Sequence, residues 1–429
     1  MPVTSFFRRP DPGDAADANR QRTLVLIMFF AAGIVFLDRF GITFLFPQIG
    51  DDLHLNHSQL GSLVSITAVT WAISSLIFSV VSDRLGGRTK WMIVASLVLF
   101  STAVGLIGLA QDYGTMLLLR AVIGFCEGPA LPLIQGAVAR ASSPDRRGRN
   151  MGIVIAGTLL IGSALAPSIM IGLATALNWR LAFPLVAVPG IVVALLVALF
   201  MREDRTAAAG APRVKARDFR LVLANRNVPL ALAGTTVCLG TNIGFGAFAP
   251  TYLHEEGLSR STATLVLTVY GCIIALGSII APAVSDRVGR KPALFAAAIC
   301  SGLVPLFFVL FAHSVPLLLA SLVVGLMAGG SLTLITYVVP GESVPRELMA
   351  TAFALQIAVG ETLGGALGPQ LGGALADATH SLKSALLLYA AAPILLAVVA
   401  LLIRETAPRL GKGTPTRKAH EASGEAALS

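Results

Sequence analysis

Long apolar runs separated by short polar segments dominate this chain. Each run is at least about 20 residues long, and a helix of that length spans the roughly 30 Å hydrocarbon core of a bilayer. The pattern therefore predicts transmembrane helices rather than barrel strands. The twelve predicted spans are residues 23–47, 59–81, 91–110, 115–138, 151–174, 181–201, 228–252, 262–283, 293–312, 316–339, 349–375 and 382–403.

Composition supports a membrane protein. Of the 429 residues, 55% are hydrophobic and 13% are charged, whereas a soluble domain carries about 25% charged residues. The net charge of +9 does not indicate nucleic-acid binding, because the basic residues lie in loops and form no single patch. The four cysteines lie within apolar runs, so we predict neither a disulfide framework nor a zinc site.

The lysines and arginines are distributed unequally between alternate loops. If the N-terminus is cytoplasmic, 27 of the 32 basic residues fall on the cytoplasmic side, and only Arg180, Arg260 and Lys383 fall outside. This asymmetry follows the positive-inside rule, so we expect both termini in the cytoplasm. Residues 1–22 are polar and lack the features of a signal peptide, which predicts a disordered cytoplasmic tail.

The sequence contains an internal repeat. The string S-D-R-L-G-G-R-T-K beginning at Ser82 recurs as S-D-R-V-G-R-K at Ser285, an offset of 203, and Pro47 recurs as Pro250 at the same offset. The repeat predicts two homologous six-helix halves, which place a substrate site between them near the membrane midplane. The predicted segments are a tail at 1–22, a first bundle at 23–201, a cytoplasmic linker at 202–227, a second bundle at 228–404 and a tail at 405–429.

Two pairs of charged residues lie inside the predicted spans, where each charge costs roughly 2.5–3.5 kcal/mol. Asp38 and Arg39 are adjacent in the first span and point about 100° apart, so each needs another partner. Arg120 and Glu127 share one face of the fourth span, roughly 10 Å apart. We expect the first and fourth spans to meet, so that all four charges share one cavity. The alternative is a charge quartet that only locks these helices together.

The second half carries fewer charges within its spans. Asp38 and Arg39 map by the repeat onto Thr241 and Asn242, so we expect Asn242 and Gln356 to complete the substrate pocket from this half. Glu361 is the exception, because it lies in a glycine-rich segment of the eleventh span. We interpret it as a second protonation or substrate site. The alternative is a structural glutamate held by helix-end amides.

The two copies of the repeated loop resemble the signature loop of the major facilitator superfamily. With the twelve spans, the resemblance covers residues 20–405 and implies an all-α membrane protein of two pseudo-symmetric six-helix bundles. In that family the loop helps to close the cytoplasmic side, with Asp83 facing a helix N-terminus of the opposite half. Alternatively, the basic residues only enforce topology. The loop residues are Asp83, Arg84, Gly86 and Arg88 in the first copy and Asp286, Arg287, Gly289 and Arg290 in the second.

The D-R pair of the first span and the string R-A-V-I-G-F-C-E-G-P of the fourth resemble the anion:cation symporter family within this superfamily. That family includes proton-coupled carriers of sugar acids and other organic anions. The resemblance implies that Arg39 and Arg120 bind the substrate carboxylate, and that Asp38 and Glu127 carry the coupled protons. The residue types fit, because an arginine fork binds a carboxylate through two hydrogen bonds and keeps its charge.

Phe36 and Trp71 depart from that family, because many members carry tyrosines at these positions. We expect both side chains to line the substrate site, which favours a more apolar or aromatic acid than a simple sugar acid.

No enzyme or ATP-hydrolysis motif is present, and His54 and His57 form no metal-ligand cluster, so we predict no catalysis, cofactor or metal. We interpret the chain as a secondary active transporter of a bacterial inner membrane that imports an organic anion with protons by alternating access. We expect it to act as a monomer in the lipid bilayer. Proton-coupled efflux of a drug or metabolite and a transporter-like sensor remain alternatives.

Overall fold

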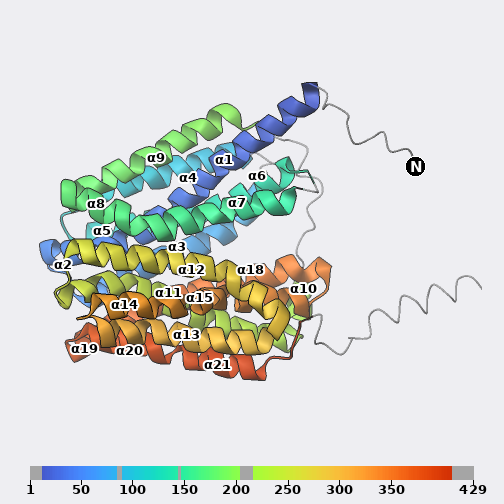
Figure 1. The fold of residues 1–429 in the computed structure, drawn as a ribbon. Coiled ribbons are helices and arrows are strands. Elements are labelled where there is room, and N and C mark those ends of the chain that lie inside the picture. The colour runs from blue at the N-terminus through green and yellow to red at the C-terminus, as the bar shows by residue number, and fades with distance from the viewer. Residues whose placement is uncertain (1–11, 85–88, 144–145, 203–215, 408–429) are drawn as a thin grey trace, which may run out of the picture.

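The computed structural model describes residues 12–84, 89–143, 146–202 and 216–407, and the regular structure in these ranges is helical (Figure 1). We call residues 12–202 the N-half and residues 216–407 the C-half. The elements of the N-half are α1 (Pro12–Gly41), η2 (Ile42–Leu45), α2 (Phe46–Leu53), α3 (His57–Arg84), α4 (Thr89–Ile107), α5 (Tyr113–Glu127), α6 (Ala130–Ala141), α7 (Arg147–Leu159), η3 (Leu160–Leu165), α8 (Ala166–Ala176) and α9 (Trp179–Phe200).

The C-half begins with a short helix, α10. Its elements are α10 (Ala216–Leu223), α11 (Asn227–Glu255), α12 (Arg260–Val288), α13 (Arg290–Phe311), α14 (Val315–Ser321), η5 (Leu322–Val324), α15 (Gly325–Ala328), α16 (Gly330–Thr333), η6 (Leu334–Val338), α17 (Val339–Ser343), η7 (Arg346–Leu348), α18 (Met349–Val359), η8 (Gly360–Gly365), α19 (Ala366–Thr379), α20 (Leu382–Ala391) and α21 (Pro393–Leu402).

Consecutive elements join into long helical runs that suit a bilayer. Within the described residues, eleven runs are long and apolar enough to cross a membrane. A further helix of 28 residues, α3, follows the first of these runs. Together these elements support the predicted all-α protein with twelve spans, so the chain is a multi-pass membrane protein.

Figure 1 shows the long helices roughly side by side, with the N-half in one layer and the C-half in the other. At one end of the bundle α9 ends and α11 begins. We call this end the linker end. The opposite end, where α2 turns into α3 and α19 turns into α20, is the distal end. The turns at the distal end place His54 and His380 in the left-handed backbone region, both with φ of 51°. By the positive-inside prediction, the linker end faces the cytoplasm.

The repeat extends to an irregularity of the backbone. The fifth long run of each half contains a π-helical segment, η3 in the N-half and η8 in the C-half. The segment η3 packs against α1 and α12, and η8 packs against α11 and α3, so each touches both halves. Such segments are frequent at functional sites. A third π-helical segment, η6, packs on C-half elements, whereas η3 and η8 both lie at the interface between the halves.

The halves meet closely along α3 and α19. A Cβ on Gly61 would lie 2.5 Å from the carbonyl oxygen of Pro369, and a Cβ on Gly373 would lie 2.4 Å from that of His57. Glycine is therefore required at both positions for the two backbones to approach. The hydroxyl of Ser65 donates to the carbonyl of Ala366 across the same interface at 2.6 Å. These contacts close the distal end.

Several boundaries differ from the sequence prediction. The first helix begins at Pro12, within residues 1–22, for which the sequence predicts a disordered tail. The fourth run is interrupted at Gly128 and Pro129, between α5 and α6, because proline cannot donate to the helical ladder. In the predicted linker, α10 is a helix whose Val222 is buried in a cluster with Val228 and Ala352, so this end of the linker is part of the C-half core.

Replacing Gly373 by valine should separate α3 from α19 and weaken distal closure, because the new side chain would overlap the His57 backbone. The measurement is maleimide labelling of a cysteine placed at Ser65 in a protein without its native cysteines. We expect labelling to become several-fold faster in the Gly373→Val background. Gly172→Val is the matched control, since nothing lies within 4 Å of a Cβ at Gly172. Equal labelling in both backgrounds would contradict the close-packed interface.

Candidate functional site

Arg39 and Glu361 form an ion pair between the two halves. Arg39 lies near the middle of the run Asn19–Leu53, and Glu361 near the middle of Arg346–Thr379. The pair is made by Nη2 of Arg39 and Oε2 of Glu361, with side chains only 6% and 14% exposed. From sequence, Glu361 is an unpaired glutamate. The structure differs, because a residue 322 positions away in the chain supplies its partner.

Aromatic rings surround the Arg39 guanidinium. Its Cζ lies 5.1 Å from the centre of the Trp71 ring and 5.8 Å from that of Phe40. A desolvated guanidinium gains about 2 kcal/mol from such a ring face. Phe36 lies one turn before Phe40 on α1 and packs on Gly162 of η3. The centres of the Phe36 and Phe40 rings are 5.8 Å apart. Trp71 therefore lies over Arg39, and Phe36 packs on the neighbouring Phe40, so the surroundings of Arg39 are apolar.

Arg120 holds the end of α1 against α3 and α5. It is fully buried, and its Nε donates to the carbonyl of Leu63 at 3.1 Å, while Nη1 and Nη2 donate to the carbonyls of Asp38 and Arg39 at 3.5 and 3.2 Å. Those two carbonyls lie where α1 passes into the 3₁₀ segment η2, so the guanidinium fixes the turn that carries Asp38 and Arg39. The first and fourth spans meet as expected, but through the main chain rather than through carboxylates.

Asp38 and Glu127 are buried, and neither carboxylate has a hydrogen-bond partner among the described residues. Asp38 is 5% exposed and Glu127 is fully buried, and no hydrogen bond in the described structure reaches any of their four carboxylate oxygens. An unpaired carboxylate in such a place costs several kcal/mol more as an ion than as a neutral acid. Both side chains therefore suit groups that gain and lose a proton as their surroundings change.

The two C-half residues expected in the pocket occupy different environments. Gln356 is fully buried: it accepts from the Thr235 hydroxyl at 2.9 Å and donates to the Val228 carbonyl at 3.2 Å. Its amide thus connects α11 and α18, and this placement differs from the expected pocket position. Asn242 is half-buried and donates to the Cys238 carbonyl at 2.8 Å. Its side-chain carbonyl oxygen accepts no hydrogen bond among the described residues.

The repeated loop can be followed only in its second copy. In the first copy, Gly86 and Arg88 lie outside the described residues, as do the side chains of Asp83 and Arg84. In the second copy, Gly289 adopts a φ of 105° between α12 and α13, a conformation that favours glycine. Arg287 is exposed.

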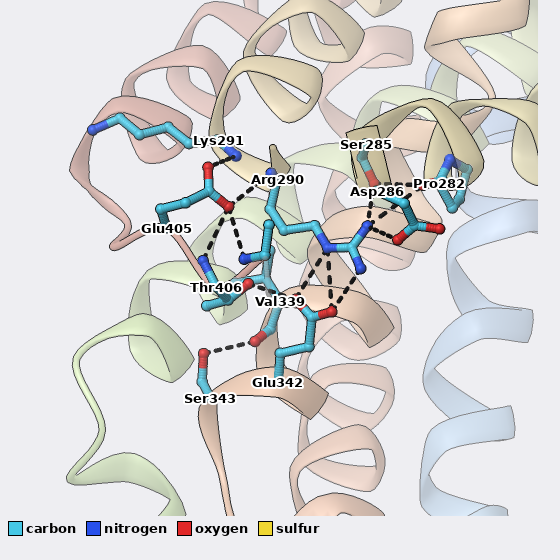
Figure 2. Close-up of polar contacts among 11 residues, drawn as sticks. Pro282, Ser285, Asp286, Arg290, Lys291, Val339, Glu342, Ser343, Glu405 and Thr406 are labelled. Atoms are coloured by element: carbon cyan, nitrogen blue, oxygen red, sulfur yellow. Dashed lines mark hydrogen bonds and ion pairs between the residues drawn. The ribbon is translucent and has the colours of Figure 1, made fainter. Parts of the chain in front are cut away.

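Arg290 is the centre of a charged cluster at the linker end (Figure 2). Its guanidinium contacts Asp286 at 2.6 Å and Glu342 of α17 at 2.6 Å, and it donates to the Ser285 hydroxyl at 2.5 Å. All these partners belong to the C-half. Asp286 is 64% exposed, so its carboxylate is paired within its own half while remaining accessible.

Glu405 caps the start of α13 in the same cluster (Figure 2). Its carboxylate accepts from the backbone N–H of Arg290 at 2.8 Å and of Lys291 at 3.0 Å. Burial alone would raise the pKa of Glu405, but backbone donors from Ala407, Lys291, Arg290 and Thr406 outweigh it and lower that pKa. Sequence reasoning missed Glu342 and Glu405. The signal was available, since each is an acidic residue beside a predicted cytoplasmic helix end.

His57 joins the halves at the distal end. Its Nδ1 lies 3.0 Å from Asp377 and its Nε2 lies 3.0 Å from Glu255. The Asp377 carboxylate also accepts from the backbone N–H groups of His57 and Ser58, at 3.0 and 2.8 Å. The sequence alone assigns His57 no role, because both carboxylates come from distant parts of the chain.

A pocket of about 420 Å³ lies near this distal contact rather than beside Arg39. Its lining includes Phe44, Asp51 and Asp52 from the N-half and His254 and Arg260 from the C-half. Its lining mixes acidic and basic side chains, so it lacks the excess of positive charge that would attract an anion. Among the described residues, no group of three potential metal ligands is found.

These features define a multi-pass transporter with charged groups at the interface of two helical halves. Two matches to the model of the Major Facilitator Superfamily cover residues 28–259 and 230–428. The chain belongs to this superfamily of transporters and is not an enzyme.

Relatives support the anion:cation symporter type. The hexuronate transporter of Bacillus subtilis is 27% identical over 93% of this chain and 98% of its own length. The probable 4-methylmuconolactone transporter of Cupriavidus pinatubonensis is 26% identical over 75% of this chain and 76% of its own length. A bacterial homologue of the human lysosomal transporter Spinster, solved inward-facing and unoccupied, has a TM-score of 0.74 at 19% identity, covering 89% of this chain and 96% of its own. At that identity the likeness shows the fold alone.

Replacing Arg120 by lysine should destabilise the protein, because one ammonium cannot reach all three carbonyls with the geometry of a guanidinium. Losing even one such charged hydrogen bond costs about 2 kcal/mol. The midpoint of thermal unfolding of the purified protein should therefore fall clearly. Arg140→Lys is the control, since Arg140 is exposed and its described hydrogen bond goes to the Thr89 hydroxyl. An unchanged midpoint for Arg120→Lys would contradict the anchoring role.

The stabilisation that His57 contributes at the distal end should weaken as pH rises. The hydrogen bond to Glu255 raises the pKa of His57 above its ordinary 6.5, against the opposing effect of burial and with further help from Asp377. The stabilisation from charged His57 is thus fully present below pH 6.5 and lost as pH rises through the raised pKa. The difference in unfolding midpoint between wild type and His57→Gln should shrink from pH 6 to pH 9. A constant difference would show that charge at His57 does not matter.

Proposed function

We propose that this protein imports an organic anion together with protons by alternating access. In this proposal it is a monomer in the inner membrane of a bacterium, with both termini in the cytoplasm. The proposal joins the positive-inside pattern, the family of the chain and the charges that the structure buries at the interface of the halves.

Arg39 is the observation that carries the proposal. A guanidinium held near mid-depth between the halves, already bound to a carboxylate and stacked on Trp71, has the chemistry of an anion site. The sequence predicts that Arg120 shares this role. Its three hydrogen bonds to main-chain carbonyls leave it little freedom, so we assign the anion to Arg39 and the support of the site to Arg120.

Asp38 and Glu127 are the proposed proton carriers. Asp38 is the chain neighbour of Arg39, and both carboxylates lack partners in the described structure. Protonation of each carboxylate removes the desolvation free energy of a buried charge. Binding of an anion to Arg39 changes the electrostatic potential at both carboxylates. Anion binding and proton binding can therefore favour the same conformation, which is what symport requires.

We propose two kinds of carboxylate as substrates: acids with an apolar or aromatic portion, and sugar acids. Phe36 and Trp71 present rings rather than hydroxyls beside Arg39. Asn242 has a carbonyl oxygen available for one polar group. One relative is named for hexuronate and another for 4-methylmuconolactone, so both kinds of compound belong in a substrate screen.

The signature loops are the proposed latch of the linker end. This role falls on Asp83, Arg84, Gly86 and Arg88 and on Asp286, Arg287, Gly289 and Arg290. The exposed Asp286 carboxylate supports it, because that group can exchange its internal partner Arg290 for a helix N-terminus of the N-half.

Transport by proteoliposomes tests the proposal. With acid outside and neutral buffer inside, purified protein should accumulate radiolabelled D-glucuronate, D-galacturonate or benzoate, and a protonophore should abolish the accumulation. Accumulation only of a lipophilic cation such as tetraphenylphosphonium, or outward movement only, would replace this proposal by efflux. Binding of an acid without any movement would indicate a sensor.

In the same assay, Asp38→Asn and Glu127→Gln should fail to concentrate the acid above its external level, because they cannot exchange the coupled proton. Exchange of labelled for unlabelled acid should persist in part. Asp112→Asn is the matched control, since Asp112 is an exposed N-cap that accepts from Thr115 at 2.8 Å, and asparagine caps equally well. Normal accumulation by either buried amide variant would remove that residue from the coupling mechanism.

A further inference from the structure

The ion pair of Arg39 and Glu361 has an unusual composition. Its cation belongs to the first helix of the N-half, whereas its anion belongs to the π-helical segment η8 of the C-half. It lies near mid-depth, while the contacts of His57 and Ser65 with the C-half lie toward the distal end. The proposed anion-binding group is thus already occupied by a carboxylate of the protein itself.

The geometry of this pair leaves it open to replacement. One hydrogen bond joins Nη2 of Arg39 to Oε2 of Glu361, whereas a guanidinium and a freely moving carboxylate can form two parallel hydrogen bonds. Trp71 lies over the guanidinium, which directs an incoming carboxylate toward the guanidinium edge. A free organic anion can therefore bind Arg39 with better geometry than the tethered glutamate.

Because Arg39 is buried, its guanidinium needs a new partner when the Glu361 carboxylate separates from it. The Arg39 side chain is 6% exposed, so an unpaired guanidinium there would cost several kcal/mol. Neither Asp38 nor Glu127 makes a hydrogen bond with it. Separation of the pair therefore needs other acceptors at Arg39, and a carboxylate substrate supplies two acceptor oxygens together with the compensating charge.

The segment η8 is fixed to its own half. A Cβ on Gly364 would lie 2.3 Å from the Thr236 carbonyl, and one on Gly360 would lie 2.7 Å from the Thr235 side chain. Because η8 packs so closely on α11, the Glu361 backbone follows the C-half. Arg39 follows the N-half through α1 and Arg120. Exchanging Glu361 for a free anion thus removes a tie between the halves.

We propose that Glu361 is an internal competitor of the substrate: its carboxylate occupies Arg39 in the empty protein, and an organic anion binds by displacing it. This inference rests on the proposed function, because it takes Arg39 as the anion-binding group. It makes Glu361 a residue that sets affinity for carboxylates and couples their binding to movement of the halves.

Equilibrium binding to the purified protein tests the inference, with D-glucuronate and benzoate as the probes. If Glu361 occupies Arg39 in about nine of ten empty molecules, removing it lowers the apparent Kd about tenfold. Glu361→Gln should therefore bind the acid more tightly than wild type does. Glu361→Ala, which offers no side-chain oxygen to Arg39, should show the same or a larger gain. Gel filtration and thermal unfolding identify which variants are folded.

Two further variants separate this role from a structural one. Arg39→Gln should abolish the gain, so that Arg39→Gln/Glu361→Gln binds no more tightly than Arg39→Gln alone. Asp112→Asn, a surface carboxylate variant, should leave Kd unchanged. A gain that survives without Arg39 would overturn the inference.

The remaining outcomes separate failure of the competitor role of Glu361 from failure of the proposed function. If wild type binds a probe and both Glu361 variants bind it equally or more weakly, the competitor role is wrong while the proposed function stands. If neither wild type nor any variant binds a carboxylate, the proposed function is wrong and the competitor role falls with it. Tighter binding by both variants supports both.

Discussion

The buried guanidinium of Arg39 constrains the whole interface between the halves. A permanent positive charge near the middle of a membrane protein needs a counter-charge or several acceptor groups beside it, and for Arg39 a carboxylate of the opposite half fills this need. The relative position of the halves is therefore linked to the occupancy of one residue. Close packing of α3 on α19 and the distal contacts of His57 add to this constraint, but neither places a charge at mid-depth.

Arg120 shows how a second buried arginine can have a different function. Two of its donors are directed to the carbonyls of Asp38 and Arg39, where α1 passes into η2. The guanidinium thereby fixes the segment that carries Asp38 and Arg39. A side chain that is committed to three main-chain partners positions the site, whereas one that shares a single partner with the opposite half can change that partner.

The sequence was sufficient for the membrane-spanning helices and the repeat, because apolar length and glycine and proline positions are local features. It also singled out the charged residues of the candidate site, since charges in apolar runs stand out. It could not give their partners. The Arg39–Glu361 pair, the main-chain contacts of Arg120 and the structural amide of Gln356 depend on how distant helices pack. The helix α10 was missed because its stability comes from Val222 packing on the C-half.

The charged groups at the two ends of the molecule have different partners. At the distal end, His57 of the N-half contacts Asp377 and Glu255 of the C-half, so polar groups join the halves. At the linker end, Arg290 contacts Asp286 and Glu342 of its own half. In the proposed alternating-access cycle, opening the distal end would leave those carboxylates to water, and closing the linker end would let the exposed Asp286 pair across the interface. An ion pair or hydrogen bond that forms at one end would then offset one that breaks at the other, which is what alternation between two conformations of similar energy requires.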